Sequence, residues 1–106
     1  MTDKILALQQ KIEKNPSQVF HRYSLAMALL ECEDFKSACR ELEICLEHNP
    51  NWMMAALFLG KTYMELAETE KAKENLEKAI QLAKEQNHDD PAEEATQLLK
   101  ECNLKE

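Results

Sequence analysis

Apolar residues recur along this chain with the spacing of amphipathic helices, and the pattern repeats after 34 residues. Asn precedes both Pro16 and Pro50, which lie 34 positions apart. Residues aligned on this period fall at the apolar positions of two successive helices, so the period reflects structure as well as numbering. The aligned pairs are Leu25 with Leu59, Ala26 with Gly60, Leu29 with Tyr63, Ala38 with Ala72, Leu42 with Leu76, Cys45 with Ala79, and Leu46 with Ile80.

The breaks in this pattern predict six helices. Good helix formers dominate the composition, and the single Gly leaves few sharp turns, so β-hairpins are not expected. The first helix carries Ile5, Leu8 and Ile12 on one stripe, and its phase is that of the second helix of a missing repeat. The predicted ranges are 3–14, 17–31, 35–48, 52–66, 69–86 and 91–102.

The last helix is separated from the others by residues 87–91. Asp90 is predicted as its N-cap, Pro91 as its first helical residue and Glu93 as the capping-box residue. One face of this helix is apolar, which predicts a cap that gives the repeats a solvated end. That face carries Ala92, Ala95, Leu98, Leu99 and Cys102.

The second copy of the repeat resembles the tetratricopeptide repeat, whose pattern is Leu-Gly-x-x-Tyr followed by a small Ala, a large apolar residue and another Ala. The first copy is similar but looser, and Lys84 stands where the family has Pro. The match covers residues 17–84, about two-thirds of the chain. The matching residues are Leu59, Gly60, Tyr63, Ala72, Leu76 and Ala79 in the second copy, and Leu25, Ala38, Leu42, Asn49 and Pro50 in the first. In the first copy Ala26 and Leu29 replace the Gly and the Tyr of the pattern.

This resemblance implies an all-α fold in which antiparallel helix–turn–helix repeats form a right-handed α-solenoid. We expect one domain over residues 1–106. Its expected parts are an N-terminal helix at 3–14, a first repeat at 17–50, a second repeat at 51–86 and a capping helix at 91–103.

Charge and composition narrow the range of partners. The chain is 44% apolar and 31% charged, and its net charge of −7 with a pI near 5.0 argues against nucleic acid or an anionic membrane surface as partner. No apolar run approaches the length of a membrane span, and the N-terminal residues do not read as a secretory signal. A cytoplasmic location is therefore expected.

Candidate chemistry is sparse. The chain has no phosphate-binding Gly motif and no Ser nucleophile signature, so we expect no enzyme, cofactor or metal. Cys45 and His48 stand three apart on one helical face, which leaves a metal site as a remote alternative. The cysteines are expected to be reduced and to pack as small apolar residues. The four are Cys32, Cys39, Cys45 and Cys102.

In the resembling family, the first helix of each repeat lines a concave groove. The corresponding face here is apolar and rich in Met, a flexible side chain that suits varied partners. The resemblance thus implies a protein-interaction module, adaptor or chaperone-like, that binds a peptide or helix of another protein. The expected groove residues are Phe20, Tyr23, Met27, Leu30, Glu31, Met54, Leu57, Lys61, Met64 and Glu65.

Several alternatives stay open. Phe20, Leu57 and Met64 can instead be core residues covered by the N-terminal helix, and the protein can be a structural subunit that self-associates, for example as a homodimer. Trp52, at the bend between repeats, is either packed or an exposed binding residue. A carboxylate clamp of the kind that binds heat-shock chaperones is not expected, because no cation occupies the matching positions. These are Phe20, Ser24, Met54 and Phe58.

Overall fold

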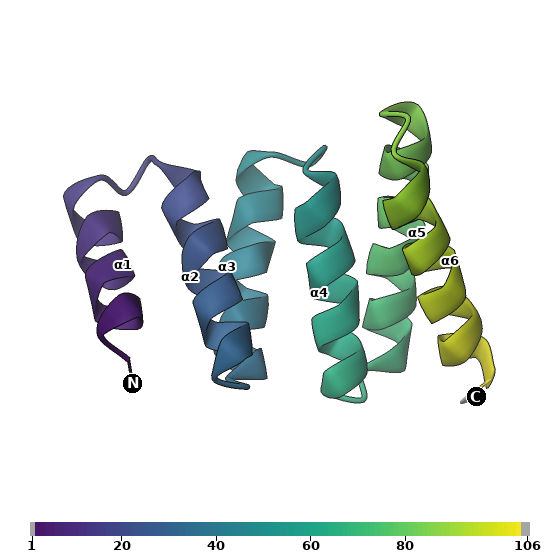
Figure 1. Cartoon of the computed structure of the whole chain (residues 1–106), viewed down its shortest axis with the longest axis horizontal. Coiled ribbons are helices and arrows are strands. Elements are labelled where there is room, and N and C mark those ends of the chain that lie inside the picture. The colour runs from purple at the N-terminus through teal and green to yellow at the C-terminus, as the bar shows by residue number, and fades with distance from the viewer. Residues whose placement is uncertain (1, 105–106) are drawn as a thin grey trace. The chain divides into compact units, whose positions relative to one another are not determined.

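The structure, a computed structural model, describes residues 2–104 and has six helices and no strand in that range (Figure 1). The expectation of an all-α helical-repeat fold is confirmed, and the helix ends lie within three residues of those expected. The helices are α1 (Asp3–Lys14), α2 (Val19–Glu31), α3 (Phe35–His48), α4 (Met53–Glu65), α5 (Thr69–Glu85) and α6 (Asp89–Leu104).

The helices form two compact units, one ending at Pro50 and the other beginning at Asn51. The N-terminal unit contains α1, α2 and α3, and the C-terminal unit contains α4, α5 and α6. That residues 1–106 act as one domain stays a prediction.

The core of the N-terminal unit forms where α2 packs against α1 on one side and α3 on another. Ile5 and Leu8 of α1 are buried against Leu25 and Leu29 of α2, in a cluster that also includes Ala28 and Ala38. Ile12 and Leu30 complete the cluster at its edge. The stripe expected on the first helix is therefore the face that α1 buries.

In the C-terminal unit, α5 packs against both α4 and α6, and α6 also contacts α4 (Figure 1). Small residues allow a close approach between α4 and α5. A Cβ built on Gly60 would lie 2.8 Å from Cγ of Leu76. Ala95 and Cys102 of α6 are buried, while Ala92, Leu98 and Leu99 are half-buried. The apolar face of the last helix is thus turned toward its own unit, and its other face is exposed, as a cap requires.

Three helices end in the same left-handed turn without glycine. Glu33, Ala67 and Asn87 have φ values of 58°, 57° and 60°, after α2, α4 and α5 respectively. After α2, the N–H of Asp34 donates to the carbonyl of Leu29 at 2.9 Å, and the N–H of Glu33 to that of Leu30 at 3.0 Å. The same pair of bonds follows α4 and α5, so all three ends are Schellman motifs.

The start of α6 differs from the prediction. The helix begins at Asp89, and the N–H of Ala92 donates to the carbonyl of His88 at 3.3 Å, so Asp90 is not the N-cap and Pro91 is not the first helical residue. The helix starts immediately after the left-handed Asn87. Pro91 is tolerated inside the first turn because N–H groups there have no helical acceptor, and the carboxylates of Asp89 and Asp90 suit the positive end of the helix dipole.

Candidate protein-interaction surface

The face of α2 expected to bind a partner is largely accessible. Phe20 is 51% exposed, and its ring meets that of Tyr23 edge-on, with centroids 6.0 Å apart. Tyr23, Met27 and Leu30 are half-buried, and Glu31 is exposed. A shallow hollow beside Phe20 is lined by Asn15, Gln18, Phe20, His21 and Ser24.

On α4 the expected residues divide into two groups. Met54, Lys61 and Met64 are half-buried and Glu65 is exposed, so all four present surface. Leu57 is 1% exposed and offers no surface to a partner. Leu57 is thus a core residue of the C-terminal unit. Phe20 is not a core residue.

Lys61 is already engaged within its unit. Its Nζ lies 2.8 Å from Oε2 of Glu94 on α6, and 5.1 Å from the centroid of the Phe58 ring. Both ion-pair side chains are partly exposed, so the pair links α4 to α6 at the surface rather than in the core. Sequence spacing alone did not reveal this partner, because Glu94 is 33 residues away.

On α2 and on α4, four residues with helical spacing form a stripe along one face of the helix. Residues at i, i+4, i+7 and i+11 lie on the same face of a helix, and the two stripes are related by the 34-residue period. Phe58, which was not among the expected binding residues, is half-buried within the second stripe. We call them the α2 stripe, with Phe20, Ser24, Met27 and Glu31, and the α4 stripe, with Met54, Phe58, Lys61 and Glu65.

Neither α2 nor α4 has a charge that favours its helix dipole at either end. α2 and α4 have no acidic residue in the first turn and no basic residue in the last turn, and each ends with a Glu. The helices that follow them have a basic residue in the last turn, His48 in α3 and Lys84 in α5. Glu31 and Glu65 therefore stand at the negative end of a helix dipole, where a carboxylate is unfavourable.

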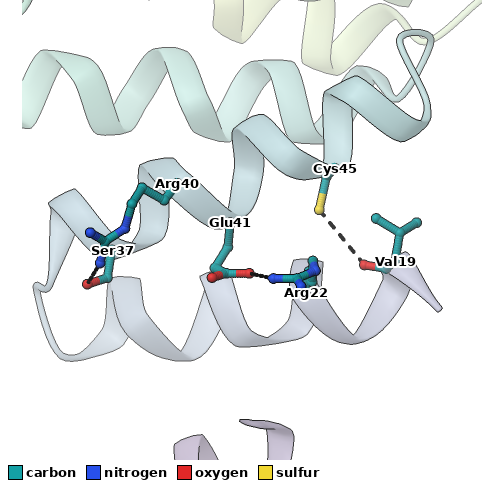
Figure 2. A network of polar contacts seen from close by, with 6 residues as sticks. All are labelled: Val19, Arg22, Ser37, Arg40, Glu41 and Cys45. Carbon is teal, nitrogen blue, oxygen red and sulfur yellow. Dashed lines mark hydrogen bonds and ion pairs between the residues drawn. The ribbon is translucent and has the colours of Figure 1, made fainter. Parts of the chain in front are cut away.

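Two polar contacts join α2 to α3 (Figure 2). Nη1 of Arg22 lies 2.8 Å from Oε1 of Glu41, and the two side chains are only 24% and 18% exposed. The thiol of Cys45 points toward the carbonyl oxygen of Val19, with 3.9 Å between Sγ and O.

The Cys45 thiol is suited to packing and not to chemistry. Burial raises its pKa from the ordinary 9.0 to about 11, the Glu41 carboxylate adds to this shift and the Arg22 guanidinium opposes it. Burial also raises the pKa of Tyr23, with a smaller contribution from Cys45. The thiol is therefore protonated at neutral pH and is not a nucleophile.

The spacing of Cys45 and His48 does not produce a shared site. Cys45 is buried against α2, whereas His48 is exposed at the end of α3. Within residues 2–104, no three His, Cys, Asp or Glu side chains converge as metal ligands would. The described cysteines are free thiols, of which Cys39, Cys45 and Cys102 are buried and Cys32 is exposed.

Trp52, the N-cap residue of α4, is half-buried, and its carbonyl accepts the N–H of Ala56 at 3.1 Å. Among the described helices, none has both the length and the hydropathy needed to cross a bilayer.

Paired antiparallel helices with small residues at their contacts, repeated after 34 residues, define a helical-repeat protein. Residues 55–86 match the family model described as tetratricopeptide repeat. The chain therefore carries a tetratricopeptide repeat, and its fold is that of small tetratricopeptide-repeat proteins. No curated protein sequence matches it.

Solved structures agree with this assignment. A tetratricopeptide repeat domain protein from Salinibacter ruber has 25% identity and a TM-score of 0.73, over 83% of this chain and 89% of that one. The TPR2B domain of yeast Sti1, in a complex with pHsp70, has 22% identity and a TM-score of 0.87, over 96% and 82%. PcrH, in complex with the chaperone binding region of PopD, has 14% identity and a TM-score of 0.89, over 95% and 77%.

Proposed function

We propose that this protein is a non-enzymatic module that binds a peptide or helix of a partner protein through the faces of α2 and α4, each within its own unit, as an adaptor or chaperone-like subunit. The carrying observation is the half-exposed ring of Phe20. An accessible aromatic side chain buries a large apolar area on binding, and such residues anchor many protein interfaces. The proposed setting is the cytoplasm, which stays a prediction from the sequence.

The rest of the proposed surface supports this anchor. Met27 lies about two helical turns after Phe20, on the same stripe of α2. Met54 and Met64 provide flexible apolar surface on α4. Two of the structurally similar proteins are complexes, one with pHsp70 and one with the chaperone binding region of PopD. Their similarity shows the same fold, and a comparable use of that fold is what we propose for this chain.

A charge-insertion variant tests the proposal. Met27→Glu combined with Met64→Glu places two charges on the proposed surface, and both side chains have room to expose them because they are only half-buried. Helical content by circular dichroism should be retained, and capture of a partner from the native lysate should be lost. The control, Gln10→Glu with Gln97→Glu, adds the same charge at exposed positions of α1 and α6 and should leave capture intact.

Two results would contradict the proposal. If the Met27→Glu/Met64→Glu protein unfolds, these methionines support the core and the surface has been assigned wrongly. If wild type captures nothing specific and its mass in light scattering rises with concentration, the protein acts by self-association instead.

A further inference from the structure

The α2 stripe and the α4 stripe carry the same types of side chain at their two ends. Each starts with a large apolar side chain, Phe20 or Met54, and ends with an exposed carboxylate, Glu31 or Glu65. These ends are eleven residues apart, which is roughly 16 Å along a helix axis. Each unit thus offers an apolar contact and a negative charge at the same separation.

The stability of the helices does not account for these carboxylates. Glu31 and Glu65 are the last residues of their helices, where the dipole disfavours a negative charge. The last turns of α3 and α5 include a cation, His48 or Lys84, as the dipole favours, although α5 also ends with a Glu, Glu85, next to its Lys. The Glu at the end of each stripe therefore has a cost that a bound cation would offset.

The two carboxylates are available to such a cation. Glu65 has no ion-pair partner within residues 2–104. Glu31 meets Nζ of Lys4 from α1 at 3.5 Å, with side chains that are 68% and 61% exposed, so this contact is weak and replaceable. Lys4 also demonstrates that an ammonium group on a helix beside α2 reaches Glu31.

We infer that the partner segment is cationic as well as apolar: a Lys or Arg pairs with Glu31 or Glu65, and a large apolar residue packs on Phe20 or Met54. This inference rests on the proposed function and specifies its ligand. The net charge of −7 favours the approach of such a segment. An extended segment covers the separation with about five residues and a helical one with about eleven.

Selection from a library of phage-displayed random peptides tests this inference on the full chain. Each peptide is about twelve residues long, so that it spans a stripe even when it is helical. Peptides enriched by the wild type should combine a Lys or Arg with large apolar residues. Glu31→Lys with Glu65→Lys should reverse the charge of the enriched peptides. The control, Glu47→Lys with Glu77→Lys, makes the same charge change at exposed positions of α3 and α5 and should keep the basic preference.

The Lys4 contact gives a second readout. Lys4→Gln removes the competing ammonium group and should tighten binding of an enriched peptide by roughly twofold, because exposed ion pairs contribute little. Lys11→Gln removes an exposed charge from the same helix and should not change the affinity. An equal effect of the two variants would show that net charge, and not Glu31, is being sensed, and would overturn the inference at that residue.

The failures of the two proposals are distinguishable. If the enriched peptides are apolar without a basic residue, or are acidic, this inference is overturned. The proposed function is then still supported, because the protein binds a peptide. If no peptide is enriched above a control without protein, the proposed function fails and this inference fails with it.

Discussion

Gly60 and Leu76 meet at a distance that leaves no space for a side chain between them: a Cβ on Gly60 would lie 2.8 Å from both Cγ and Cδ2 of Leu76 and 3.3 Å from its backbone nitrogen. We predict that Gly60→Ala destabilises the protein by about 1 kcal/mol. The gain in helix propensity is about 1 kcal/mol, but overpacking a filled contact costs about 1–3 kcal/mol. The free energy of unfolding in urea measures the balance.

The first repeat provides the matched control for this change. Ala26 is the counterpart of Gly60 and is fully buried. Ala26→Gly should lose about 1 kcal/mol through helix propensity and about 0.8 kcal/mol more through the loss of a buried methyl group. If Gly60→Ala is instead more stable than the wild type, α4 and α5 separate without cost and the contact with Leu76 is not tight.

At the left-handed turns, substitution by glycine is expected to increase stability rather than to lower it. Glu33 and Ala67 have positive φ values, a conformation that costs a residue with a Cβ about 1–2 kcal/mol. Ala67→Gly and Glu33→Gly should each stabilise the protein by about 0.5–1 kcal/mol, since part of the relief is offset by the freedom of Gly in the unfolded chain. Urea unfolding again gives the value. Ala7→Gly, at an exposed helical position of α1, should be destabilising, and a loss in all three variants would contradict the left-handed assignment.

The buried thiol of Cys45 predicts a pH dependence. Its pKa is about 11 in the folded protein and near the ordinary 9.0 when unfolded, so the unfolded state loses its proton first as the pH rises. Its contribution to stability is complete below pH 9 and is lost between pH 9 and about 11. We expect the free energy of unfolding to fall across this interval, and to fall less steeply in Cys45→Ala.

Thiol reactivity gives an independent check on the same residue. At pH 8, Ellman's reagent should react quickly with Cys32, which is exposed, and slowly with the buried thiols until denaturant is added. Fast modification of Cys45 in the native protein would contradict its burial against α2.

The carboxylate at the end of α4 predicts a conflict between stability and binding. Glu65→Gln should raise the free energy of unfolding by about 0.3–1 kcal/mol, because it removes a negative charge from the negative end of a helix. Glu70→Gln, the same change in the first turn of α5, should lower stability. If both variants are destabilised equally, the effect comes from the amide and not from the dipole.

Much of the fold could be predicted from the sequence because the repeat imposes the same packing twice. A residue such as Leu42 or Leu76 must be apolar in both copies, and a small residue must face it, so each copy supports the interpretation of the other. The aligned pairs consist of buried residues in nearly every case, with half-buried Ile80 as the exception. The stripe on α1 was recognised from helical spacing instead: Ile5, Leu8 and Ile12 share one side, while Leu6 lies outside the stripe and is exposed.

What escaped prediction depends on backbone turns and long side chains. Ala67 is a good helix former, and only the bonds made by the residues after α4 hold it in a left-handed conformation. The start of α6 was misplaced because Asp90 and Pro91 satisfy the rules for a cap, while the turn at Asn87 starts the helix earlier. The pairing of Lys61 with Glu94 depends on which face α6 turns toward α4, which no local spacing specifies.

The grouping of the helices has a consequence for how the chain folds. In each unit the principal packing is between helices that follow one another in sequence, α1 with α2, α2 with α3, α4 with α5 and α5 with α6. Contacts between near neighbours close short loops, and proteins built from them fold on the microsecond-to-millisecond scale. The N-terminal unit has all three of its helices by Pro50, so during synthesis it can acquire its core before the C-terminal unit has formed.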